Sequence, residues 1–418
     1  MRTIGGFAVA GRRVLVRDDL NVPLDDGQVT DDGRIRAALP ALTALTDRGA
    51  RVIVCAHLGR PAGRPDPTYS LAPAAARLSE LPGRPVTLAA DVTGPSARAA
   101  VASLGPGGVV MLENLRFDAR ETSTDDAQRG LFAGELAALA GLYVADGSGV
   151  VHRKQASVCD VARRLPHAAG YLVRAEVAAL RRLITGIRRP YAVVLGGAKA
   201  GDKSGAIGDL TGVAGRILIG GAMAFPFLAA RGCKAGTSLL AGQVDLARAA
   251  LEVAARAGTT IIVPSDVVVA GERAADAPHE VTAADAIPAG QMGLDIGPET
   301  ARTFAASIRG ARTVFWNGPM GVFELAPYAD GTRAIAWALA ASTAFTVLGG
   351  GDTGAAIRAL GSADSAFGYI STGGGASLEF IQGKTLPGLV VLDEPCIQTS
   401  QVPTQTDPEE VRHEEQPK

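Results

Sequence analysis

The chain has 418 residues and a net charge of −1, with 47% hydrophobic and only 5% aromatic residues. This length is typical of two domains, and the aliphatic composition favours helix-covered parallel sheets over a β-sandwich or a disordered chain. A net charge near zero gives no overall field that would attract nucleic acid or an anionic membrane surface. We therefore expect small-molecule partners, with no nucleic acid and no membrane among them.

The cysteines and the N-terminal segment carry little functional signal. The four cysteines are far apart and form no C-x-x-C pair, so we expect reduced thiols and no zinc or redox site. The first residues lack a sustained apolar core, and no run in the chain reaches the roughly 18 apolar residues of a membrane span. These features predict a cytoplasmic protein.

Short apolar runs alternate with helical stretches along the whole chain. In the first half these runs lie at 13–17, 51–56, 109–112 and 142–145. In the second half they lie at 191–197, 216–222, 259–266, 313–318, 344–352 and 369–375. This alternation predicts parallel sheets with right-handed crossovers. We therefore expect an α/β protein of two doubly wound, Rossmann-like domains.

An amphipathic helical stretch separates the two series and predicts a connecting hinge helix. The expected organisation is an N-terminal domain over 1–168, an interdomain helix over 169–186, a C-terminal domain over 187–388 and a polar tail over 389–418. The tail is rich in Pro, Gln and Glu, and burial cannot compensate the entropy of ordering it. We expect the tail to be disordered.

In the first half, arginines follow the predicted strands. The five candidates are Arg17, Arg34, Arg60, Arg116 and Arg153. Guanidinium groups bind carboxylates and phosphates in bidentate fashion, so these loops would form a basic pocket for a small polyanion. Asn21 and His57 lie in the same loops. Any one of these arginines, taken alone, is better explained as an ordinary surface residue.

In the second half, glycines follow the predicted strands instead. The clusters are "LGGAKAGDK", "IGGAMAF", "LGGGDTG" and "STGGGAS". A glycine turn before a helix lets a phosphate approach the backbone and the positive end of the helix dipole. The first cluster departs from a P-loop because Asp202 intervenes before Lys203. Together the clusters predict a nucleotide site, although each one could be a structural turn.

The segment "GGGDTG" at 349–354 also fits the G-x-G-x-x-G fingerprint of dinucleotide binding. That alternative, an NAD-dependent dehydrogenase, lacks the acidic residue expected after the next strand, which ends in Ser371 and Thr372. Asp352 could instead hold Mg²⁺ on a phosphate or cap the following helix. The sequence contains no G-x-S-x-G and no H-E-x-x-H motif, which favours phosphoryl transfer between oxyanions, a reaction that needs no general base.

Nine segments in fixed order closely resemble the phosphoglycerate kinase family, from about Val14 to Gly388. They are "RDDLNVP", "HLGRP", "ENLRF", "LGGAKAGDK", "IGGAMAF", "MGLDIGPET", "WNGPMGVFE", "GGGDTG" and "STGGGASLE". The resemblance implies a monomer that exchanges a phosphoryl group between 1,3-bisphosphoglycerate and ADP, giving 3-phosphoglycerate and ATP. It implies Mg²⁺ as cofactor and a hinge-bending closure of the two domains.

The same resemblance implies the site residues. The substrate-binding residues would be Asp19, Asn21, Arg34, His57, Arg60, Arg116 and Arg153. The catalytic residues would be Arg34, Lys199, Lys203, Gly373, Gly374 and Gly375. The nucleotide would contact Gly197, Lys203, Gly220, Gly221, Asn317, Glu324, Gly350, Gly351, Asp352 and Thr353. Within this set Glu324 would bind the ribose and Asp352 the Mg²⁺.

The chain also departs from the family pattern. The family usually reads N-D-A-F-G and then H-R-A-H where this chain has "ADGSG" at 145–149 and "HRKQ" at 152–155, so an aromatic residue and a histidine are missing. Asp18, Ala222 and Gln291 also differ from the pattern. These changes leave open the alternative of a divergent paralogue that binds nucleotide, turns over weakly or not at all, and serves a regulatory or interaction role. The family's chain end often packs on the first domain, but this tail differs, and we expect it to be disordered.

Overall fold

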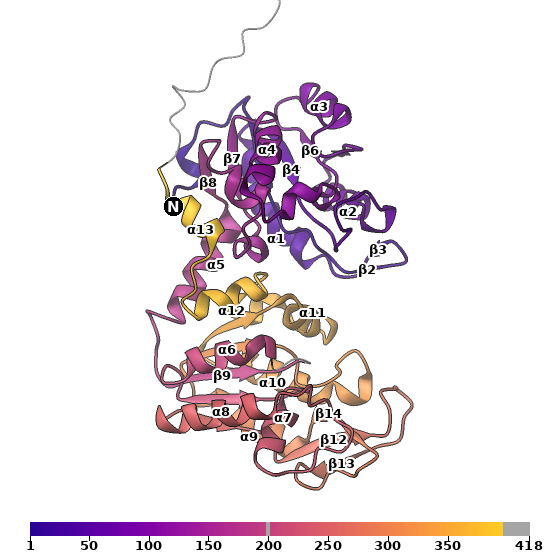
Figure 1. The fold of residues 1–418 in the computed structure, drawn as a ribbon, viewed down its shortest axis with the longest axis vertical. Coiled ribbons are helices and arrows are strands. Elements are labelled where there is room, and N and C mark those ends of the chain that lie inside the picture. Colours follow the sequence, from indigo (N-terminus) through magenta and orange to yellow (C-terminus); the bar gives the residue numbers. More distant parts are fainter. Residues whose placement is uncertain (198–200, 396–418) are drawn as a thin grey trace, which may run out of the picture.

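The computed structural model describes residues 1–197 and 201–395. It consists of two lobes, each built on one sheet with helices on its faces, and helix α5 (Tyr171–Arg182) runs between them (Figure 1). Both central sheets have six strands, and all of their strand pairs are parallel. The expected α/β fold class with two doubly wound domains is confirmed. None of the helices in the described part of the chain is long and apolar enough to cross a membrane.

The N-terminal sheet has the order β5-β6-β4-β1-β7-β8. Its strands are β1 (Arg13–Arg17), β4 (Arg51–Cys55), β5 (Val86–Leu88), β6 (Val109–Met111), β7 (Leu142–Ala145) and β8 (His167–Ala169). A short hairpin consists of β2 (Leu24–Asp25) and β3 (Gln28–Val29). The helices are α1 (Gly33–Asp47), α2 (Ala72–Glu80), α3 (Pro95–Ala102) and α4 (Asp126–Ala137).

The apolar run of the central strand β1 is continuous because both faces of the sheet are buried at this strand. Its successive side chains point to opposite faces of the sheet, and helices cover both faces. Leu15 belongs to the core on one face, whereas Val14 and Val16 belong to the core on the other. All three are fully buried. Arg17, Asp18 and Asp19 therefore emerge at the carboxyl edge of this sheet, where ligands of parallel sheets bind.

The C-terminal sheet has the order β11-β10-β9-β15-β16-β17. Its strands are β9 (Tyr191–Leu195), β10 (Arg216–Ile219), β11 (Thr260–Ile262), β15 (Thr313–Asn317), β16 (Phe345–Gly349) and β17 (Tyr369–Ile370). An additional antiparallel sheet, which the sequence analysis did not anticipate, consists of β12 (Asp266–Ala270), β13 (His279–Ala283) and β14 (Met292–Ile296). The helices are α6 (Gly201–Leu210), α7 (Ala224–Ala230), α8 (Val244–Arg256), α9 (Pro298–Arg309), α10 (Asp330–Ala340), α11 (Gly351–Ala359) and α12 (Gly375–Ile381).

Helix α5 packs on both lobes. Val173 and Val177, in its first turns, belong to an N-terminal core cluster, whereas Leu180 belongs to a C-terminal one. The helix begins where Oδ1 of Asp146 accepts a hydrogen bond from the backbone N–H of Leu172 at 2.7 Å. The helix is therefore anchored at both ends, as a connector between two domains requires. The boundaries expected at 168 and 186 stay predictions.

The last helix of the described residues returns to the N-terminal domain. Helix α13 (Pro387–Asp393) lies against that lobe (Figure 1), and Val391 and Leu392 are buried in its core. The α-amino group of Met1 is 2.7 Å from Asp393. The expectation of a disordered tail from residue 389 is therefore wrong for 389–395, because the apolar "LVVL" segment finds a core to enter. Residues 396–418 lie outside the described residues.

Candidate active site

The first part of the site lies at the carboxyl end of β1. Asp19 forms an ion pair with Arg34 from α1, and Oδ1 of Asp19 accepts a hydrogen bond from the backbone N–H of Asn21 at 3.3 Å. Burial alone would raise the pKa of Asp19, but the positive charges of Arg34 and Arg17 lower it. Asp19 is therefore ionised and holds the Arg34 guanidinium in place.

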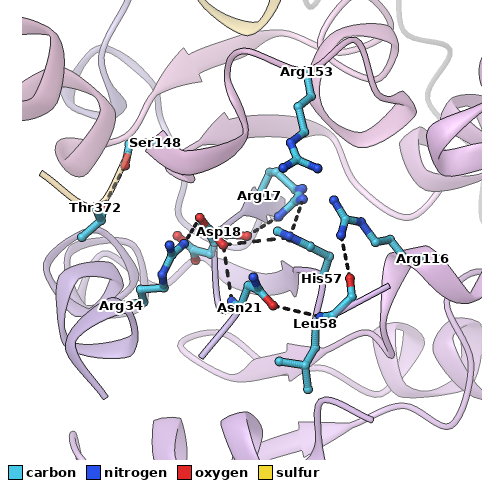
Figure 2. Close-up of polar contacts among 12 residues, drawn as sticks. Arg17, Asp18, Asn21, Arg34, His57, Leu58, Arg116, Ser148, Arg153 and Thr372 are labelled. Carbon is cyan, nitrogen blue, oxygen red and sulfur yellow. Dashed lines mark hydrogen bonds and ion pairs between the residues drawn. The ribbon is translucent and has the colours of Figure 1, made fainter. Parts of the chain in front are cut away.

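His57 is neutral in this environment. Burial lowers its pKa well below the usual value, and the attraction of Asp19 does not offset that effect. Nη2 of Arg17 lies 3.3 Å from Nδ1 of His57 (Figure 2). Because a guanidinium can only donate, Nδ1 is the acceptor and the ring proton lies on Nε2. His57 can therefore donate a hydrogen bond to a ligand oxygen from Nε2.

The loop after β4 is fixed through the backbone of Gly59. Oδ1 of Asn21 accepts from the Gly59 N–H at 2.9 Å, and Nη1 of Arg116 donates to the Gly59 carbonyl at 2.6 Å. Gly59 has φ of 57°, which a glycine adopts without strain. These contacts set the direction in which His57 and Arg60 leave the loop.

Three arginines concentrate positive charge beside His57. Burial lowers the pKa of Arg116 to about 10, and the nearby charges of Arg153, Arg17 and Arg60 contribute to that shift. Burial, followed by the charge of Arg60, lowers the pKa of Arg153. In Figure 2 the guanidinium groups of Arg17, Arg116 and Arg153 converge on His57. Such a cluster of repelling cations is stabilised by an anion, and its geometry suits a phosphate or carboxylate.

Asp18 is a buried acid next to this cluster. It is fully buried, and neither carboxyl oxygen has a hydrogen-bond partner in the described part of the chain. Burial raises its pKa well above the usual value, and the nearby carboxyl of Asp146 raises it further. Both effects favour the neutral form of Asp18, in which it does not oppose the positive charge of the pocket.

The second part of the site lies at the carboxyl ends of β9, β10, β15 and β16. Nζ of Lys203 donates to the carbonyl oxygens of Gly196 and Asn317, which ties the end of β9 to the end of β15. Gly221 has φ of 62°, and a Cβ there would lie 2.6 Å from the backbone nitrogen of Gly197. These turns are therefore packed too closely for side chains.

The turn after β16 leads directly into α11. Oγ1 of Thr353 donates to the carbonyl of Gly349 at 2.7 Å and accepts from the N–H of Gly318 at 2.8 Å. Gly350 has φ of 91° and is the N-cap residue, so Asp352 lies in the first helical turn and is not the cap itself. The unpaired N–H groups and positive dipole of this helix end favour a phosphate, and Asp352 adds an oxygen ligand beside it.

The remaining predicted residues are distributed as follows. Gly220 packs against Met320, and the N–H of Gly373 donates to Oγ of Ser371 at 3.1 Å. Gly374, with φ of 54°, caps α12, and a Cβ at Gly375 would lie 3.9 Å from Nε2 of His152. The carboxylate of Glu324 is exposed and lies 3.9 Å from Arg273. Lys199 falls outside the described residues.

The two halves of the site face each other across a cavity of about 390 Å³. The N-terminal domain contributes Asn21 and Arg34 to its lining, and the C-terminal domain contributes Gly350, Gly351 and Asp352. Nη2 of Arg34 lies 3.3 Å from the point that a Cβ on Gly351 would occupy. The basic pocket and the glycine turns therefore meet at one place.

Sequence reasoning missed three residues that line or border this cleft. Asp31 and Arg358 line the same cavity, and Ser148 forms a hydrogen bond with Thr372 across the domains. No sequence motif identifies Asp31 or Arg358, because the two residues become neighbours only when the domains approach each other. One feature of the sequence could have identified Ser148: it lies within the segment that departs from the family pattern.

Two parallel α/β domains, with an arginine pocket on one and glycine-rich helix N-termini on the other, define a two-domain phosphotransferase. The family model described as "Phosphoglycerate kinase" matches residues 4–384. The chain is 58% identical over 392 residues to the phosphoglycerate kinase of Streptomyces griseus, covering 92% of this chain and 97% of that one. It is 60% identical over 394 residues to that of Pseudarthrobacter chlorophenolicus, with the same coverage of 92% and 97%.

Solved structures give the same result. The phosphoglycerate kinase of Pyrococcus horikoshii matches with a TM-score of 0.86 at 32% identity, over 94% of this chain and 98% of that one. The enzyme of Coxiella burnetii matches with a TM-score of 0.77 at 35% identity, over 93% and 98%. The chain belongs to the phosphoglycerate kinase family, and it is a kinase that acts on small molecules. Nothing in these comparisons supports the divergent paralogue, and the family assignment replaces the dehydrogenase alternative.

Proposed function

We propose that the protein moves a phosphoryl group between 1,3-bisphosphoglycerate and ADP, giving 3-phosphoglycerate and ATP, with Mg²⁺ and by closure of its two domains. The observation that carries this proposal is the shared cavity: Arg34 from one domain and Asp352 from the other line it together. Each substrate would bind to one domain, and closure would bring the reacting groups into line.

The N-terminal pocket suits the acid substrate. Arg60, Arg116 and Arg153 would hold its phosphate, and Nε2 of His57 would donate to one of its oxygens. Arg34, held by Asp19 at the edge of the cleft, would hold the carboxyl group that gives or receives the phosphoryl group. Asn21 supports this pocket through Gly59.

The glycine turns of the C-terminal domain suit the phosphates of a nucleotide. Lys203 and the N-termini of α11 and α12 provide positive charge and N–H donors there. Glu324 would bind the ribose, and its exposed carboxylate lies 3.9 Å from Arg273. Gly197, Gly220, Gly221 and Asn317 would border the nucleotide.

The residues at α11 fit a magnesium ion that arrives with the nucleotide. Asp352 supplies the hard oxygen ligand that Mg²⁺ prefers. The described residues contain no group of three or more His, Cys, Asp or Glu side chains that could hold a metal by themselves. Phosphate oxygens and water would therefore complete the coordination. When bound, Mg²⁺ neutralises charge on the phosphates.

The transfer itself needs no general base. The attacking and leaving oxygens are both ionised at neutral pH, so the protein must supply only positioning and positive charge to a loose, metaphosphate-like group. Arg34, Lys199 and the N–H groups of Gly373–Gly375 would provide that charge. Closure would exclude water, which would otherwise hydrolyse the acyl phosphate. A monomeric state and a cytoplasmic location stay predictions from the sequence, as does the absence of nucleic-acid and membrane partners.

A coupled assay with 3-phosphoglycerate, ATP and Mg²⁺ tests the proposal, with Lys199→Ala as the blank. We expect turnover on the order of 10 per second or more, which is ordinary for an enzyme. The Lys199→Ala variant should lose turnover far more than substrate affinity, because the charge acts mainly in the transition state. A parent rate equal to that of the blank, while Mg-ADP still raises the melting temperature, would replace the proposal with the binding paralogue.

A further inference from the structure

An ion pair joins the two domains at the edge of the cleft. Nη2 of Arg358, on α11, lies 2.7 Å from Oδ2 of Asp31, on the segment that precedes α1. The two side chains are partly buried, with exposed fractions of 31% and 21%. Because the two residues belong to different domains, the pair exists only while the domains are close together.

Each partner is also tied to the helix that carries a site residue. Oδ1 of Asp31 accepts a hydrogen bond at 2.8 Å from the N–H of Gly33, the first residue of α1, and Arg34 follows directly. Arg358 lies on the same helix as Asp352. Nη1 of Arg358 is 3.4 Å from Asp364 of its own domain, which aligns the guanidinium before the domains meet. The pair therefore links α1 to α11.

Two glycines leave room for this guanidinium, one from each domain. A Cβ on Gly33 would lie 2.6 Å from Nη2 of Arg358, and a Cβ on Gly354 would lie 3.3 Å from the same atom. Neither glycine has a positive φ, so the backbone does not require glycine at these positions. Glycine also costs stability inside a helix. A side chain at Gly33 would displace the Arg358 guanidinium, and one at Gly354 would crowd it.

We infer that Asp31 and Arg358 are positioning residues for phosphoryl transfer, whose ion pair holds α1 and α11, and with them Arg34 and Asp352, in the placement that turnover requires. This inference rests on the proposed function. It assigns the two residues no contact with the reacting atoms. Their effect is to favour the closed arrangement of the domains over the open one.

Kinetics of Arg358→Gln and Asp31→Asn test the inference. Asn retains an oxygen that can accept from Gly33, so Asp31→Asn removes the charge and leaves the start of α1 intact. For either variant we expect kcat/KM to fall about three- to fivefold for both substrates, as for a partly exposed pair. The double variant should lose no more than Arg358→Gln alone. Arg358→Lys, which keeps the charge, should lose less.

Two further readouts separate a positioning role from a structural one. The dissociation constants of 3-phosphoglycerate alone and of Mg-ADP alone should not change, because each ligand binds one domain. Arg77→Gln is the matched control: it removes a 2.7 Å pair with Asp32 that has similar exposure but lies within the N-terminal domain. We expect this control to keep its kcat/KM within about twofold of the parent value. Arg358→Gln within the same limit would overturn the inference.

The domain arrangement can be measured without turnover. Small-angle X-ray scattering of the ligand-free protein should give a larger radius of gyration for Arg358→Gln and Asp31→Asn than for the parent, and an unchanged one for Arg77→Gln. If the protein had no kinase activity, the proposed function would be refuted. The scattering measurement would still test whether the ion pair holds the two domains together. Equal radii for the parent and both variants would show that the pair does not hold the domains together.

Discussion

The hydroxyl of Ser148 lies 2.7 Å from the hydroxyl of Thr372, and this hydrogen bond joins the N-terminal domain to the turn that leads into Gly373–Gly375 (Figure 2). Ser148 stands where the family pattern has an aromatic residue. A small, largely apolar cavity lies beside it, lined among others by Val151, Val177 and Phe380. The chain therefore has a polar contact between its domains where an aromatic side chain would fill space.

Ser148→Ala should slow turnover while leaving folding intact. A hydrogen bond contributes about 0.5–1.5 kcal/mol, so we expect kcat to fall about two- to tenfold if the bond favours closure. Steady-state kinetics and a melting curve measure the two effects. Thr372→Ser keeps the hydroxyl and should stay near the parent rate. Unchanged kcat in Ser148→Ala would mean that this contact does not contribute to closure.

Arg34→Lys should be costly despite keeping the charge. The planar guanidinium can bind Asp19 and a substrate carboxylate together, and a point charge cannot reproduce that fork. We expect kcat to fall more than about tenfold, with a smaller change in KM. Initial rates at varied 3-phosphoglycerate would show this. A loss of no more than about twofold would place Arg34 outside the site.

Asp295 should make stability depend on pH. Burial raises its pKa to about 8, although the N–H groups of Gly331 and Ile296 donate to it and lower the pKa in part. Between the unfolded value of 3.8 and 8, the folded protein binds a proton that the unfolded chain has released. The free energy of unfolding therefore falls as pH rises through this window, by up to about 1.4 kcal/mol per pH unit.

Asp295→Asn should remove this slope. The amide keeps an acceptor oxygen and cannot ionise, so the difference in the free energy of unfolding between variant and parent should grow from about pH 5 to pH 8. Chemical denaturation at several pH values measures it. Asp245→Asn, with 93% of its side chain exposed, is the control and should follow the parent. Parallel curves for Asp295→Asn and the parent would contradict the prediction.

Leu392→Ala should destabilise the N-terminal domain, although residue 392 is close to the C-terminus. Leu392 is 3% exposed within the N-terminal core, and truncation of a buried leucine costs about 2–5 kcal/mol. Val390, 42% exposed in the same helix, is the matched control and should lose less than about 0.5 kcal/mol on change to Ala. Urea unfolding compares the two. Equal losses would mean that α13 does not stabilise the core.

The sheets could be predicted because their signal is local. A strand such as Val14–Val16 is buried on both faces, so it reads as a continuous apolar run that ends in polar residues. The antiparallel sheet was missed, because β13 exposes most of its residues and has no such run. The helix at 387–393 was missed for another reason: four apolar residues before a polar tail signal burial only when a core elsewhere in the chain accepts them.

The sequence by itself determined the two-domain α/β class, the family and the residue types of the site, since strand periodicity and ordered motifs are properties of neighbouring residues. The sequence identified Arg34, His57 and Asp352 as candidate site residues, and their roles stay predictions. Only the tertiary structure decided that Asp31 meets Arg358 and that Ser148 meets Thr372. Each pair is separated by more than two hundred residues, and its contact depends on how the two domains approach one another. Local sequence does not encode that approach.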